Sequence, residues 1–117
     1  MVRAVYLDNS ATTRARPEVV RAVVAALEET YGNPSSPHGL GFRAERLVKE
    51  AREAVARALG AEPAEVVFTS GGTEANNLAL VGAAHALRRR GRRVITTRVE
   101  HPSVLRACER LEEEGFE

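Results

Sequence analysis

The residues best suited to chemistry lie between an apolar run and a helical segment, in the stretch TSGGTEANNLAL at 69–80. Ser70 and Thr73 supply hydroxyl donors, and Gly71 and Gly72 let the backbone approach a ligand closely or adopt a positive φ angle. The first turn of a helix has backbone N–H groups without an internal partner, and the helix dipole is positive there. A strand, a glycine turn and a helix N-terminus together favour an anion site, usually for phosphate.

The same stretch also fits an ordinary turn from a strand into a helix, in which Thr73 merely caps the helix. The dinucleotide-binding pattern G-x-G-x-x-G is absent, and no Gly-Lys-Ser or Gly-Lys-Thr follows, as it would in a P-loop. The local pattern alone therefore leaves the anion site and the helix cap as equal alternatives.

The pair Glu100-His101 is the second candidate site. His101 follows the short apolar segment 94–97 and precedes Pro102, which opens a helix, so it is expected at the carboxyl end of a strand. Proteins of the α/β class place ligands at such ends. The alternative, which the residues alone favour, is a histidine near a helix N-cap without a chemical role.

Other polar candidates have simpler explanations. His38 and Asn33 lie in a glycine- and proline-rich loop, where they either line a site entrance or form a structural turn. His85 is expected on the surface of a helix near an arginine cluster. Cys108 shares a helical face with apolar residues, which indicates a small buried hydrophobe. The three histidines and Cys108 lack the spacing of a metal site, so no metal is expected.

Composition is ordinary for a soluble globular protein, with 44% hydrophobic and 28% charged residues. A net charge of +1 does not favour nucleic acid or a membrane surface as a partner. No apolar run reaches about 18 residues and no signal peptide is present, which predicts a cytoplasmic location. A single cysteine excludes an internal disulfide.

The elements that must position these residues alternate along the chain. Strands are expected at 3–7, 66–69 and 94–97. Helices are expected from Pro17 to about residue 27 and at 42–59, where Gly60 ends the helix, and then at about 73–90 and 102–114. This alternation predicts an α/β layer structure. The chain stops where its next strand is expected, which indicates a piece of a longer protein.

Four segments occur in order: YLDNSATT at 6–13, YGNPSSPHGLG at 31–41, VVFTSGGTEANNLAL at 66–80 and VEHPSVL at 99–105. With them, the chain resembles the N-terminal part of a cysteine desulfurase, in the class V aminotransferase group of pyridoxal-phosphate (PLP) enzymes. The resemblance implies the start of the large domain of a type I PLP-dependent transferase fold, an α/β fold with an incomplete sheet. It implies an N-terminal arm at 1–14 and the start of the PLP-binding large domain at 15–117.

The resemblance also implies roles for the two candidate sites. Gly72 and Thr73 match positions that contact the PLP phosphate, with Ser70 and Gly71 in the same loop, and His101 matches the histidine that stacks on the pyridine ring and assists proton transfer. L-cysteine is then the substrate, the full-length enzyme is a homodimer, and a sulfur-acceptor protein, for example in iron–sulfur cluster assembly, is a possible partner.

In the resembled family three functional residues come later in the chain. They are the lysine that binds PLP covalently, the acidic residue that pairs with the pyridine nitrogen, and the nucleophilic cysteine. Lys49 is the only lysine in this sequence, and it is expected on the polar side of its helix. It is therefore not expected to take the place of the lysine that binds PLP. The parent chain is thus expected to be an enzyme and the 117 residues alone to be inactive. Selenocysteine lyase, another class V enzyme and an inactive interaction module remain the alternatives.

Overall fold

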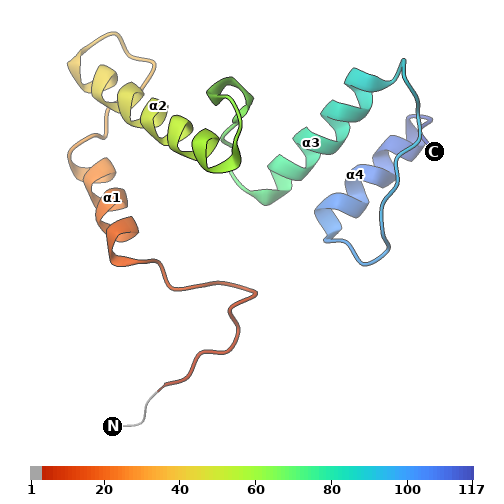
Figure 1. Ribbon diagram of the computed structural model, residues 1–117, viewed down its shortest axis with the longest axis horizontal. Coiled ribbons are helices and arrows are strands. Elements are labelled where there is room, and N and C mark those ends of the chain that lie inside the picture. The colour runs from red at the N-terminus through yellow and green to blue at the C-terminus, as the bar shows by residue number, and fades with distance from the viewer. Residues whose placement is uncertain (1–3) are drawn as a thin grey trace. The chain divides into compact units, whose positions relative to one another are not determined.

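The computed structural model describes residues 4–117, which divide into two compact units, one ending at Val66 and the other spanning residues 67–117. Within the described residues the chain forms four α-helices and one short 3-10 helix and no strand (Figure 1). The α-helices are α1 (Pro17–Glu28), α2 (Gly39–Leu59), α3 (Gly72–Leu87) and α4 (Pro102–Glu113). The 3-10 helix is η1 (Pro63–Glu65). None of the helices in this part of the chain is both long and apolar enough to cross a membrane.

Helix boundaries in the first unit follow local signals. Pro17 occupies the first position of α1, where its missing N–H costs nothing. Helix α2 begins three residues earlier than the sequence predicts, because the Nδ1 atom of His38 accepts a hydrogen bond from the Gly41 N–H at 3.3 Å and caps the helix. Gly60 ends α2 with φ 66° and ψ 30°, the left-handed conformation that favours glycine.

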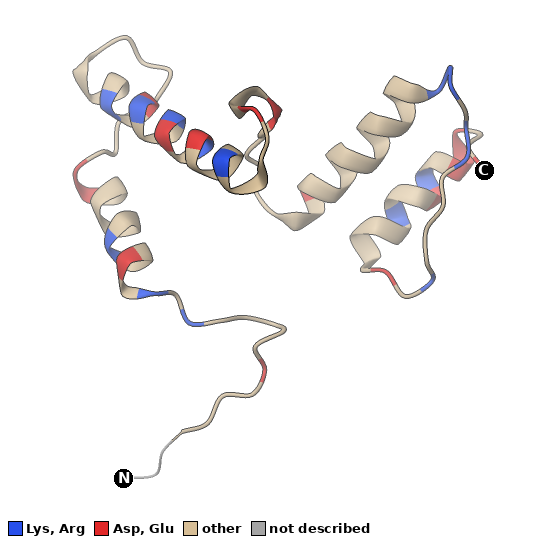
Figure 2. Cartoon of the chain, viewed as in Figure 1, with Lys and Arg blue, Asp and Glu red and all other residues tan. Residues whose placement is uncertain are grey.

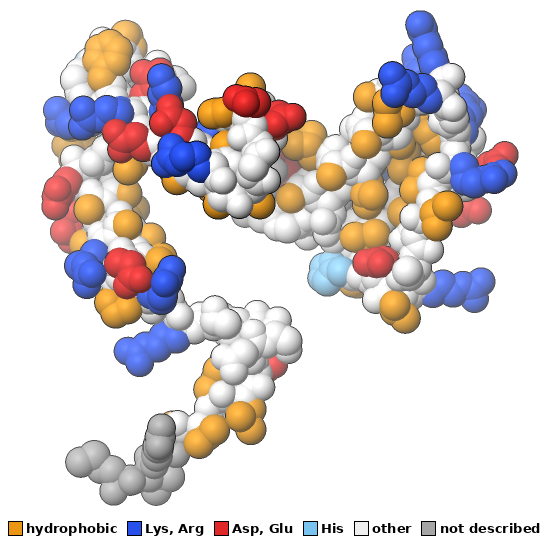
Figure 3. Space-filling model, viewed as in Figure 1, with side chains coloured by type: hydrophobic (Ala, Val, Ile, Leu, Met, Phe, Trp, Pro, Cys, Tyr) orange, Lys and Arg blue, Asp and Glu red, His pale blue; other side chains and the backbone are white. Residues whose placement is uncertain are grey.

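The apolar stripe of α1 remains open to solvent within the first unit. Val19, Val20, Val23, Val24 and Leu27 are 43–71% exposed, and Figure 3 shows hydrophobic side chains along this helix. Helix α2 is tied instead to η1 and the residue after it, since the Arg52 guanidinium donates to the Val66 carbonyl. The helical periodicity of α1 is thus confirmed, while the burial of its stripe is not observed in this unit.

The second unit has a small core between α3 and α4, which lie side by side with their N-termini at the same end (Figure 1). Ala107 and Leu111 of α4 are each 1% exposed, and Phe116 after α4 is 7% exposed. Charge on α3 is limited to Glu74 at its start, while arginines follow its end (Figure 2). Those arginines are exposed to solvent, and positive charge at the C-terminal end of a helix interacts favourably with the helix dipole.

The three expected strands are a wrong prediction for the structure as described. Residues 66–69 and 94–97 have no assigned strand, and neither do residues 4–7 of the 3–7 segment, whose first residue lies outside the described part. A strand is defined by a hydrogen-bonded ladder, so a β-branched run alone cannot form one without a partner. The incomplete sheet is therefore not observed, and the α/β assignment rests on likeness to known folds.

One short backbone pairing does form in the second unit. The Glu117 N–H donates to the Arg92 carbonyl and the Val94 N–H donates to the Glu117 carbonyl, both at 2.8 Å. Glu117 therefore bonds to Arg92 and Val94, the two residues on either side of position 93, which is the hydrogen-bond pattern between parallel strands. Glu117 therefore lies beside residues 92–94, and α4 connects these two segments along the chain.

Candidate functional site

The stretch at 70–73 forms the N-terminus of α3. Gly71 is the N-cap residue, in extended conformation, and the first helical hydrogen bond joins the Ala75 N–H to the Gly71 carbonyl at 3.1 Å. The backbone N–H groups of Gly72, Thr73 and Glu74 have no acceptor within residues 4–117. Three amide donors therefore point out of the positive end of a 16-residue helix, which is the arrangement that binds an anion.

The space around this turn also fits a phosphate group. A Cβ atom added to Gly71 or Gly72 would meet no atom of the described chain within 4 Å. Neither glycine lies in the left-handed region, since Gly71 is extended at φ 168° and Gly72 is helical, so the turn does not require glycine for its own conformation. The sequence suggested two reasons for glycine here, a left-handed backbone and the close approach of a ligand. The geometry agrees only with the second.

Thr73 does not cap the helix. It is the second helical residue, it is exposed, and no side-chain cap bond is present at the start of α3. The capping explanation for Thr73 is therefore wrong, because the N-cap position belongs to Gly71. The Thr73 hydroxyl lies in the same turn as the three amide donors, and it can add a fourth donor to them.

Ser70 and Glu74 form a contact across the turn that the sequence analysis missed. The Ser70 hydroxyl and the Ser70 N–H both donate to the Glu74 carboxylate, at 2.6 and 2.7 Å. These bonds, the hydroxyl first and the backbone second, lower the pKa of Glu74, while burial slightly opposes them. The carboxylate stays ionised near the helix N-terminus, which favours negative charge. An acidic residue at the third helical position after a serine was the signal available in the sequence.

His101 is the N-cap residue of α4. Its Nδ1 atom accepts a hydrogen bond from the Ser103 N–H at 3.2 Å and lies 2.8 Å from the Ser103 hydroxyl. The residue as a whole is exposed. The capping role foreseen as the simpler alternative is thus present, but it uses only one of the two ring nitrogens. The Nε2 edge has no partner within the described residues and is free to meet a ligand.

A hydrogen bond between α3 and α4 brings the two candidate sites to one end of the second unit. The Asn76 side-chain amide donates to the Ser103 hydroxyl at 2.8 Å, although 27 residues separate the two along the chain. Asn76 lies one turn after the anion-binding amides, and Ser103 lies two residues after His101. The parallel arrangement of the helices in Figure 1 places both N-termini at the same end.

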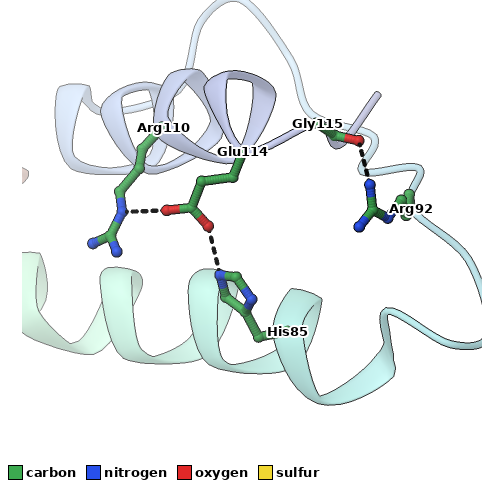
Figure 4. A network of polar contacts seen from close by, with 5 residues as sticks. All are labelled: His85, Arg92, Arg110, Glu114 and Gly115. Atoms are coloured by element: carbon green, nitrogen blue, oxygen red, sulfur yellow. Dashed lines mark hydrogen bonds and ion pairs between the residues drawn. The ribbon is translucent and has the colours of Figure 1, made fainter.

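His85 is at the opposite end of the same helix pair, and it is not a free surface residue as predicted. Its Nε2 atom pairs with the Glu114 carboxylate at 2.7 Å (Figure 4). Its ring also meets the Phe116 ring edge-on, with 5.6 Å between the ring centroids. Arg110 donates to the same carboxylate at 2.9 Å. The Arg110 hydrogen bond lowers the pKa of Glu114 most, burial opposes it, and His85 lowers it further. The network ties α3 to the end of α4.

The remaining candidates have structural roles or none. His38 caps α2, and the Asn33 side-chain oxygen accepts from the Ser35 N–H at 2.9 Å, so both stabilise their loop. Cys108 is half-buried rather than buried, because it borders a groove of about 520 Å³ between α4 and residues 94–98. Lys49 is exposed on α2. In residues 4–117 no group of three or more metal-binding side chains is close enough together to hold an ion.

Comparison with protein families gives a match that covers nearly the whole chain. Residues 5–117 match the family described as aminotransferase class-V. Among curated proteins, the chain is 50% identical over 117 residues to a cysteine desulfurase IscS of Dictyoglomus turgidum, covering 100% of this chain and 30% of the relative. It is 49% identical to a cysteine desulfurase IscS of Methanosarcina thermophila, covering 98% of this chain and 28% of the relative.

Solved structures show the same likeness. A NifS-like protein superposes with a TM-score of 0.84 at 41% identity, covering 93% of this chain and 30% of that one. DndA from Streptomyces lividans superposes with a TM-score of 0.77 at 45% identity, covering 97% of this chain and 32% of that one. The chain thus spans about 30% of the length of the proteins that it resembles.

Proposed function

The chain belongs to the class-V aminotransferase family, and we propose that it is the N-terminal segment of a PLP-dependent cysteine desulfurase. Such an enzyme converts L-cysteine to L-alanine and passes the sulfur to one of its own cysteines. The names of the relatives support this activity, since both curated proteins described above are cysteine desulfurases. In this proposal residues 1–14 form an N-terminal arm, and residues 15–117 begin the large PLP-binding domain with its sheet.

The observation that carries the proposal is the shared location of the two candidate sites. The Asn76–Ser103 hydrogen bond holds the N-terminus of α3 beside the N-terminus of α4. The amides of Gly72 and Thr73, with the Thr73 hydroxyl, would hold the phosphate of PLP through the positive end of α3. Ser70 and Gly71 flank the same cup, and Ser70 would share its donors between Glu74 and the phosphate.

His101 would meet the pyridine ring of PLP. Its exposed imidazole offers a flat face for stacking and an Nε2 edge for proton exchange with the substrate. PLP supplies, when bound, the electron sink that makes bonds near the substrate's α-carbon breakable. The residues of this chain bind and orient the cofactor, and His101 holds or transfers a proton at Nε2.

Other parts of the proposal depend on residues outside this segment. The covalent lysine, the acidic partner of the pyridine nitrogen and the sulfur-carrying cysteine would come from elsewhere in the full-length protein. We propose a cytoplasmic homodimer that delivers sulfur to an acceptor protein, with iron–sulfur cluster assembly as one destination. Lys49 has no role in this proposal, and its side chain is exposed on α2.

The proposal is tested by incubating the full-length protein with PLP and L-cysteine and measuring alanine and sulfide. Equal amounts of both products are expected in the presence of a thiol reductant. Selenocysteine, run in parallel, separates a desulfurase from a selenocysteine lyase. PLP binding without either product would instead assign the segment to another class V enzyme. The 117-residue chain alone should release neither product, and turnover that disappears in Lys49→Ala would refute the exclusion of that lysine.

A further inference from the structure

The hydrogen bonds around His101 define which ring nitrogen carries the proton. A backbone N–H can only donate, so the 3.2 Å bond from the Ser103 N–H requires a lone pair on Nδ1. In a neutral imidazole one nitrogen is protonated and the other is an acceptor. A ring that accepts at Nδ1 therefore carries its proton at Nε2, the edge without a partner within the described residues.

The Ser103 hydroxyl also lies beside Nδ1, where it can share the single lone pair with the Ser103 N–H. Its oxygen accepts a hydrogen bond from the Asn76 amide at 2.8 Å, and an amide N–H2 group cannot accept. The hydroxyl proton is then free to point elsewhere, and Nδ1 lies 2.8 Å away. The direction of donation thus runs from the Asn76 amide to the Ser103 hydroxyl and from there to the ring.

We infer that Asn76 and Ser103 are positioning residues that hold His101 as the tautomer protonated at Nε2. They act on the ring through Nδ1, and within the described residues neither side chain is hydrogen-bonded to the exposed Nε2 edge. The consequence is that His101 presents a proton donor, and not a proton acceptor, at the edge that a ligand meets. This inference deepens the proposed function, because it gives that edge a defined direction of proton transfer.

A simple N-cap histidine would behave differently. The Ser103 N–H alone also favours protonation at Nε2, so the wild-type tautomer by itself does not separate the two explanations. The polarity of the Asn76 side chain does separate them. Asn76→Asp keeps the shape but replaces the donor by an acceptor, so the Ser103 hydroxyl would donate to the carboxylate. The hydroxyl oxygen would then accept from the ring, which favours protonation at Nδ1.

Long-range ¹H–¹⁵N correlation spectra of the imidazole groups in the ¹⁵N-labelled full-length protein, prepared without PLP, read the tautomer directly. The His101 signals are assigned by their loss in His101→Gln, and spectra are recorded at alkaline pH, where imidazole groups are generally neutral. Wild type should show His101 protonated at Nε2. Each neutral hydrogen bond to Nδ1 favours that tautomer by about 2- to 12-fold. Ser103→Ala should lower the ratio of the Nε2-protonated to the Nδ1-protonated tautomer by this amount, about 2- to 12-fold. Asn76→Asp should lower the ratio further or reverse it.

Asn77→Asp is the matched control, because the Asn77 amide donates to the Thr73 carbonyl within α3 and does not touch Ser103. It should leave the His101 tautomer unchanged. Wild-type His101 protonated at Nδ1, or an Asn76→Asp spectrum identical to wild type while the α4 amide signals remain folded, would overturn the inference. If Asn76→Asp unfolds α4, Ser103→Ala decides the test, and an excess of the Nε2 tautomer equal to that of wild type would then overturn the inference. The spectra are recorded without PLP, so the relay can hold even where the desulfurase assignment fails.

Discussion

Removal of the Thr73 hydroxyl tests whether the start of α3 is an anion site or only a helix end. The structure makes this test sharp, because Gly71 is the N-cap residue and Thr73 makes no cap bond. Thr73→Val keeps the shape of the side chain and deletes the hydroxyl, whereas Thr73→Ser keeps the hydroxyl. Thr73 is exposed, so neither change removes buried contacts.

The two effects of Thr73→Val should differ in size. A hydrogen bond to a charged group contributes about 1.5–3 kcal/mol, so PLP affinity should fall by about 10- to 150-fold. The free energy of unfolding of the protein without cofactor should change by no more than about 0.5 kcal/mol, as for other exposed positions. A lost cap would have cost about 1 kcal/mol.

PLP affinity is measured by absorbance titration of the full-length protein from which the cofactor has been removed, and stability by urea unfolding of the same preparations. Thr73→Ser should bind PLP within a few-fold of wild type. The reasoning would fail if Thr73→Val and Thr73→Ser bound PLP equally well. It would also fail if Thr73→Val lowered the stability of the cofactor-free protein by as much as it weakened binding, because that result describes a cap.

Three further predictions concern other parts of the second unit. In the full-length enzyme His101→Phe should still bind PLP but turn over cysteine about 10²- to 10⁴-fold more slowly, the usual loss for a general acid–base group. Steady-state alanine formation measures this turnover. Turnover equal to that of wild type would leave His101 only a stacking role. The pKa of Glu114 is lowered by Arg110, so the Glu114 carboxylate stabilises the fold at neutral pH and this contribution disappears as the pH falls through the lowered pKa. Thermal unfolding between pH 7 and pH 3 should therefore show a smaller acid-induced loss for Glu114→Gln than for wild type, and parallel curves would contradict the assignment. Leu111→Ala, at a position 1% exposed, should lower the free energy of unfolding by about 2–5 kcal/mol in urea titrations followed by circular dichroism, whereas Leu78→Ala, at a 51% exposed position, should cost much less.

Local signals in the sequence were enough to locate the helices. Pro17 at the start of α1, Gly60 at the end of α2 and Pro102 at the start of α4 act within one turn of their own positions, so one sequence reveals them. The start of α2 was missed by three residues because the His38 cap depends on a side-chain orientation. Strands were overpredicted for the opposite reason, since a ladder needs a partner that a β-branched run does not specify.

The candidate site was only half visible in the sequence. Glycines and hydroxyls at 70–73 indicate an anion site by type and spacing, and the geometry of α3 fits that indication. Asn76 was not recognised, because its partner Ser103 lies 27 residues away and helical periodicity does not say which faces meet. The same limit explains His85, whose contact with Glu114 joins two helices.

The position of Glu74 explains how a carboxylate and an anion site can share one helix N-terminus. A free carboxylate in the first turn would compete with a phosphate for the same amides and repel it. Here the Glu74 carboxylate turns back to the Ser70 N–H and hydroxyl, which precede the N-cap, and it takes no bond from the amides of the first turn. Those bonds order the loop that carries Gly71 and Gly72, while the three amides after the cap stay available. The acidic residue therefore shapes the cup and leaves its donors to the ligand.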